Sequence, residues 1–158
     1  MAEELTHRVL AVAAFNSSWE LLERERTEEE DLELLEVALA SRHHWRHEGG
    51  PQQLAIADWM VSRCFAELGD GTLALRFARS ALVEEPPDGP AWLRASLLEG
   101  LARAHAANGD WGERDDAAAR AVAALAAEDD EEDRALIEAQ LASVPSAEGP
   151  GPMAPRST

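Results

Sequence analysis

The chain has 158 residues, of which 46% are hydrophobic and 28% charged, and its formal net charge at pH 7 is −17. This length and this share of apolar residues are sufficient for one globular domain with a sizeable core, and they argue against global disorder. The acidic balance opposes binding to nucleic acid or to an anionic membrane surface, because bulk electrostatics would repel both.

Three features of the sequence favour a cytoplasmic protein. No apolar stretch reaches membrane-spanning length. The N-terminal segment is acidic and lacks the basic region of a signal peptide. The single cysteine, Cys64, cannot form an internal disulfide, which suits a reducing compartment.

Helical periodicity predominates along the first half of the chain. The first expected helix covers about residues 3–23. Thr27 and Glu30 have the spacing of a capping box, which predicts a second helix running to about His47. Gly49-Gly50 then ends that helix, and Pro51 starts a third helix that continues to about Leu68. The apolar stripe expected on the first helix consists of Leu5, Val9, Val12, Trp19 and Leu22.

Four more helices are expected in the second half. Gly69-Asp70-Gly71 is a tight turn with Thr72 as the expected cap of the fourth helix, which the PPDGP sequence at 86–90 stops. The fifth helix ends at Asn108-Gly109, and Asp110 caps an Ala-rich sixth helix. The acidic run 128–133 opens a seventh, packed through Leu136, Ile137 and Leu141. Residues 1–143 therefore form one all-α domain, and the Pro- and Gly-rich residues 144–158 are expected to be a disordered tail.

Two segments, 59–86 and 92–128, share a pattern. Each has a Trp, a small residue among apolar ones, and then Gly-Asp. Phe65, Ala74, Ala81 and Pro86 match the spacing of the tetratricopeptide pattern, and Leu101, Ala102, His105, Gly109 and Ala121 match it more loosely. The chain thus resembles divergent tetratricopeptide repeats. That resemblance implies about three stacked helical hairpins and a closing helix.

A second resemblance is more local. It rests on His44-Trp45, Gly50-Pro51, Trp59, Ser62-Arg63, Phe65 and Leu68-Gly69. This segment is similar to an uncharacterised family of bacterial tetratricopeptide-like proteins. The resemblance implies kinship and a fold, and it carries no activity.

A candidate partner site lies on the third and fifth helices. In tetratricopeptide hairpins the first helix of each pair lines the concave groove, and by the same spacing Trp59 and Arg63 fall on that face, with Arg103 at the matching place in the next hairpin. Two arginines over an aromatic ring would form a clamp for a carboxylate. The alternative is that each arginine pairs with a neighbouring glutamate. His44 and Trp45 are further candidate partner-binding residues.

The densest group of metal-ligating side chains is His43, His44, His47 and Glu48. Residues four apart share a helical face, so these pairs could hold a divalent metal with His7 or His105 as a third ligand. The alternative is a polar helix end, where cationic histidines complement the helix dipole. No HExxH and no cysteine pair accompanies the cluster, and we therefore expect no bound metal.

Nothing in the sequence has the pattern of a nucleophilic enzyme. Cys64 lies on the apolar side of its helix, where a thiol is inert, and there is no GxSxG elbow and no phosphate-binding loop. We therefore expect a non-catalytic binding module without a cofactor, recruiting a peptide or protein partner. A metal-dependent helical enzyme and a structural homodimer joined through Trp-bearing faces are the alternatives.

Overall fold

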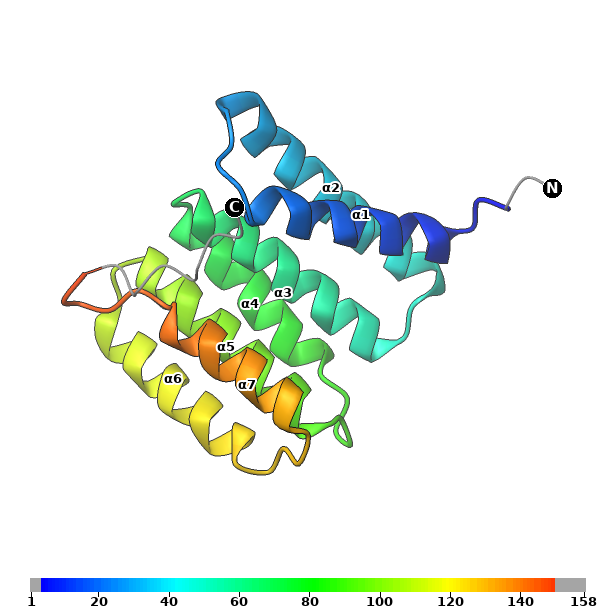
Figure 1. Ribbon diagram of the computed structural model, residues 1–158. Coiled ribbons are helices and arrows are strands. Elements are labelled where there is room, and N and C mark those ends of the chain that lie inside the picture. Colours follow the sequence, from blue (N-terminus) through cyan, green and yellow to red (C-terminus); the bar gives the residue numbers. More distant parts are fainter. Residues whose placement is uncertain (1–3, 150–158) are drawn as a thin grey trace.

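The computed structural model describes residues 4–149, and these residues form seven helices and no strand (Figure 1). The all-α prediction is therefore confirmed. The helices are α1 (His7–Leu22), α2 (Glu28–Glu48), α3 (Pro51–Glu67), α4 (Gly71–Glu84), α5 (Ala91–Ala107), α6 (Trp111–Leu125) and α7 (Glu131–Ala142). Within the described range, no helix is long and apolar enough to span a bilayer.

The helices form three antiparallel pairs, α1–α2, α3–α4 and α5–α6, with α7 placed against α5 (Figure 1). The backbone of each odd-numbered helix also lies close to that of the next odd-numbered one. No two even-numbered helices among the described residues approach in this way, although Arg42 of α2 lies over the Phe77 ring of α4, 5.4 Å from its centre. We call the side on which the odd-numbered helices contact one another the inner face.

Two of the turns are built in the same way. Gly69 and Gly109 adopt φ values of +82° and +76°, a left-handed conformation that favours glycine. In each turn the amide after the glycine, Asp70 or Asp110, bonds back to the helix at 2.9 Å. Asp70 accepts from the Leu73 amide and begins α4. The expectation that Thr72 caps this helix is therefore wrong, because the helix begins at Gly71 and the carboxylate of the preceding Asp70 reaches the free amide.

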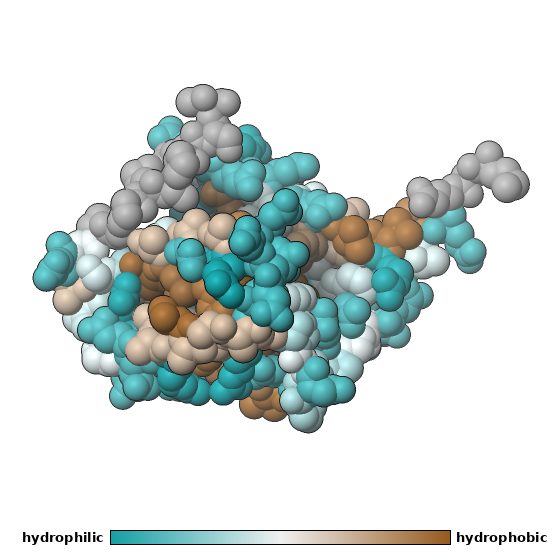
Figure 2. Space-filling view, turned by 60° about the horizontal axis from the view of Figure 1, so that its bottom comes forward, coloured by the Kyte–Doolittle hydropathy of each residue, from teal (hydrophilic) through white to brown (hydrophobic). Residues whose placement is uncertain are grey.

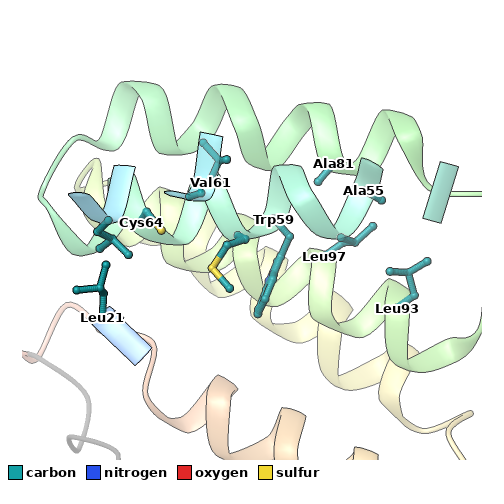
Figure 3. Packing of buried hydrophobic residues seen from close by; sticks show 11 residues of the cluster. Leu21, Ala55, Trp59, Val61, Cys64, Ala81, Leu93 and Leu97 are labelled. Carbon is teal, nitrogen blue, oxygen red and sulfur yellow. The ribbon is translucent and has the colours of Figure 1, made fainter. Parts of the chain in front are cut away.

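One core cluster joins the first two pairs to α5, around residues such as Trp59, Val61, Cys64 and Leu97 (Figure 3). The stripe predicted on α1 is rotated from the observed one. Leu5 and Val12 are exposed, and Ala11, Ser18 and Leu21 are buried instead. Small residues occupy the positions where helices approach closely, so a search for large apolar residues misplaces the stripe. On α7, Leu136 is exposed against the expectation, whereas Ile137 is buried as expected.

The packed chain extends beyond residue 143. Val144 is buried in the second core cluster. Arg114 of α6 donates to the carbonyl oxygens of Val144 at 3.0 Å and Pro145 at 2.8 Å. Val144 and Pro145 therefore dock on the domain, and Ser146 and Gly149 close a turn after them, where the sequence predicts a tail. The remainder of that predicted tail, 150–158, lies outside the described residues.

Candidate functional site

A fully buried carboxylate occupies the centre of the inner face. Glu99 lies midway along α5, and its side chain has no exposed surface. Oε2 accepts a hydrogen bond from Trp59 Nε1 of α3 at 3.1 Å, and Oε1 accepts two from Arg103, from Nε at 2.9 Å and from Nη2 at 2.6 Å. A buried charge is tolerated only when it is paired and hydrogen-bonded, and both conditions hold for Glu99.

Arg103 also joins α5 to the end of α7. Its Nη2 donates to the Gln140 carbonyl oxygen at 3.0 Å and to Ser143 Oγ at 2.9 Å. These groups lie at the C-terminus of α7, where Gln140 also accepts from the amide and the hydroxyl of Ser143, and a cation there complements the helix dipole. Arg103 is therefore committed to internal partners, and its first role is structural.

Arg63 is held differently from Arg103. Its Nη1 lies 3.7 Å from Glu99 Oε1, beyond hydrogen-bond distance, and its guanidinium lies 5.3 Å from the centre of the Trp19 ring. Both Nε and Nη1 are buried without a hydrogen-bond partner. Burial, and then the nearby charge of Arg103, lower the pKa of Arg63, while Glu99 partly opposes the shift. Arg63 is thus a cation whose donors are incompletely used.

The structure brings Trp59, Arg63 and Arg103 together, as their spacing predicts. It also places Trp59 in the core, so the indole does not lie open on the groove as expected. The sequence alone did not identify Glu99 as part of this site. Its carboxylate occupies the position between Arg63 and Arg103 where the carboxylate of a partner was expected. A signal was present: Glu99 is the only acidic residue between Ala91 and Ala107 and lies among apolar neighbours.

Four histidines gather where the start of α1 meets the end of α2. His7 Nδ1 and His44 Nδ1 lie 2.8 Å apart, so one imidazole donates to the other. His47 stacks on His7 with ring centres 4.3 Å apart, and His43 lies edge-on to both His44 and His47. Burial, and then the charges of the other three histidines, lower the pKa of His44. Protonation of this group is therefore disfavoured in the folded chain.

This cluster includes His7, one of the two extra ligands considered for a metal, and leaves out His105, whose Nδ1 lies 3.6 Å from Asp110. Glu48 accepts a hydrogen bond from the Arg8 amide at 2.6 Å. Across residues 4–149, no three His, Cys, Asp or Glu side chains are arranged to hold a metal ion. Trp45, the neighbouring candidate, is buried beneath Arg8, which lies 5.4 Å from its ring centre.

No family model, no curated protein and no solved structure matches this chain. Function is therefore argued from the geometry of the described residues. The thiol of Cys64 is a poor nucleophile, because burial raises its pKa to about 12 and keeps it protonated. The inner face, with its partly unsatisfied Arg63, is the strongest candidate for a site.

Proposed function

We propose that this chain is a non-catalytic, tetratricopeptide-like binding module that recruits a peptide or protein partner through a carboxylate at the inner face. The module acts in the cytoplasm without a cofactor, a membrane or a nucleic acid. The observation that carries the proposal is the state of Arg63, a guanidinium with two buried donors that no group in the described chain accepts.

Charge supports the same assignment. Two guanidiniums, those of Arg63 and Arg103, meet the single carboxylate of Glu99, and the hydrogen bonds of that carboxylate go to Arg103 and Trp59. Glu67, one turn along α3, lies 3.6 Å from Arg26. Around Glu99, two guanidiniums therefore face one carboxylate, and Glu67 is the further carboxylate whose charge acts on Arg63. The Arg63 side chain is partly exposed, and an incoming carboxylate would pair with its guanidinium there.

The neighbouring rings favour a peptide over a free ion. Trp19 lies beneath the Arg63 guanidinium, and its ring centre is 5.8 Å from that of Trp59. Trp19 is partly exposed, so a partner side chain next to the bound carboxylate would find an aromatic surface. Arginine and tryptophan are the residues that most often dominate binding energy at interfaces.

The test compares peptides that differ only at the carboxylate. A random peptide library with free C-termini and the same library with amidated C-termini would be presented to the purified protein. Bound peptides would then be titrated by calorimetry. We expect retention of the free-acid peptides and at least tenfold weaker binding by Arg63→Ala, the loss of about 1.4 kcal/mol expected when a charged hydrogen bond goes.

The matched control is Arg76→Ala. Arg76 is an exposed arginine on α4, away from the inner face, and its removal changes the net charge by the same amount. Equal losses for both variants would show that bulk charge governs binding and would overturn the proposal, as would equal retention of the amidated library. Circular dichroism melts exclude unfolding of Arg63→Ala as the cause.

A further inference from the structure

A second surface lies on another part of the molecule, between α6 and α7. Six residues line a hollow of about 330 Å³ there: Val122, Leu125, Ala126, Arg134, Glu138 and Leu141. Figure 2 brings this side forward and shows apolar surface gathered in a hollow with polar residues around it. Leu125 and Ala126 lie three and four positions after Val122, and Glu138 and Leu141 lie four and seven after Arg134, so each helix presents one face to the hollow.

The hollow exists because the last junction of the stack is looser than the earlier ones. α3 packs closely on α2, and α5 packs closely on α4. α7 instead packs mainly on α5 and has only a slight contact with α6. Val122 is consequently 60% exposed although it points toward this junction. The Nε atom of Arg134, also in the wall, is buried without a partner.

The shape and lining favour a helix as the occupant. The volume is at the lower end of the roughly 300–1,000 Å³ typical of small-molecule pockets, and the hollow is open along two roughly parallel helices. An amphipathic helix places apolar side chains at positions i, i+3, i+4 and i+7 into such a groove. The groove offers aliphatic contacts from Val122, Leu125 and Leu141 to receive them.

The charge around the groove distinguishes between a second copy of the chain and another protein. Residues 111–142 contain ten acidic residues and three arginines, and six of those acids form the run 128–133 at one end of the groove. Two copies meeting here would bring like charges together, which costs several kcal/mol at an interface. A partner with basic residues would be attracted instead.

We propose that the α6–α7 groove binds a basic amphipathic helix of a partner protein, with its apolar stripe in the hollow and its lysines or arginines beside the acidic run 128–133. This surface is separate from the inner face and does not depend on Arg63.

The probe is a synthetic 18-residue peptide of leucine and lysine with leucines at helical i, i+3, i+4, i+7 spacing. Two comparison peptides have the same length: one with glutamate in place of lysine, and one with the leucines and lysines in scrambled order. We expect the helical leucine–lysine peptide to bind at least tenfold more tightly than either one. Amide shifts in NMR spectra should cluster at Val122, Leu125 and Leu141.

The variant pair is Val122→Lys and Val83→Lys. Both valines are exposed and helical, and both changes add the same charge, but Val83 lies on α4 away from the groove. Val122→Lys should weaken peptide binding at least tenfold, and Val83→Lys by no more than threefold. Arg63→Ala should leave this binding unchanged, which separates failure here from failure at the inner face.

Three results would overturn the inference. The scrambled peptide could bind as tightly as the helical one, which would mean that binding depends on the charge of the peptide and not on its apolar stripe. Val83→Lys and Val122→Lys could weaken binding equally. Sedimentation could show a wild-type dimer that Val122→Lys dissociates, which would make a second copy the occupant.

Discussion

Trp59 donates its indole N–H to Glu99 across the α3–α5 interface, and these residues lie 40 positions apart, the interval that also separates Gly69 from Gly109. Arg63 and Arg103 have the same separation, as do Trp19 and Trp59, whose rings are in contact. Equivalent positions of successive helix pairs therefore meet in rows along the inner face. A substitution at one position of a row should therefore alter the packing of the equivalent residue in the next helix pair.

The first prediction concerns the charge at the centre of that row. Glu99→Gln would leave Arg103 and Arg63 without a carboxylate in a buried setting. We expect a loss of about 3–5 kcal/mol in the free energy of unfolding, because an uncompensated charge remains in the interior. Urea denaturation measures this loss, with the exposed Glu113→Gln on α6 as the control. A loss below about 1 kcal/mol would indicate that water reaches the network.

The second prediction uses two glycines in helices. A Cβ at Gly100 would meet Trp59 Cδ1 at 2.6 Å and Nε1 at 3.0 Å, so Gly100→Ala should displace the indole. We expect destabilisation by about 1–3 kcal/mol from overpacking, against the gain of up to about 1 kcal/mol that alanine brings to a helix. At Gly112 no atom lies within 4 Å of an added Cβ, so Gly112→Ala should be neutral or stabilising in the same thermal melts. Equal effects of the two substitutions would contradict this account.

The sequence was informative where a local rule fixed the outcome. The capping box of Thr27 and Glu30 forms as predicted, because both partners lie within one turn. The helix ends at Gly69 and Gly109 reflect backbone conformations that glycine favours. Glu99 could not be placed in this way: a lone acid in an apolar helix indicates a buried charge, but its partners come from α3 and from its own helix.

Long-range geometry decided the other differences. The position of His7 against His44 depends on how α1 crosses α2, and no spacing within one helix determines that crossing. Composition alone places Val144 in the tail, because the residues after it are rich in proline and glycine. Arg114, 30 positions earlier, holds its carbonyl in place.

The third prediction concerns acid. The pKa of His44 in the folded chain is lowered below its ordinary value of 6.5, so the unfolded chain takes up the proton at a higher pH. Stability contributed by this group is complete above about pH 6.5 and is lost as the pH falls through the folded-state pKa. The melting temperature should therefore drop between pH 7.5 and 5.5, and by less in His44→Gln. Titrations of the carboxylates are common to both proteins, so the difference reports on His44 and the three histidines that interact with it.

The fourth prediction is that the purified protein holds no stoichiometric zinc, iron or nickel. His7 and His44 are joined through their Nδ1 atoms, and the described residues supply no third ligand in a suitable arrangement. Elemental analysis after dialysis measures the content. About one metal per chain that is lost in His44→Ala would contradict the binding-module proposal and favour a metal-dependent activity.

The last prediction separates the contribution of residues 144–149 from that of residues 150–158. A chain ending at Ser143 loses Val144, which is 2% exposed, and the two carbonyls that accept from Arg114. Burial of a valine side chain contributes about 1.5–3 kcal/mol, so this truncation should lower the melting temperature by several degrees. A chain ending at Gly149 keeps all of these contacts. The residues that it lacks are rich in proline and glycine, so it should melt within a degree or two of the full chain. Restoring 144–149 should therefore recover the lost stability. If both truncations melted alike, the contacts of Val144 and Arg114 would contribute little to folding.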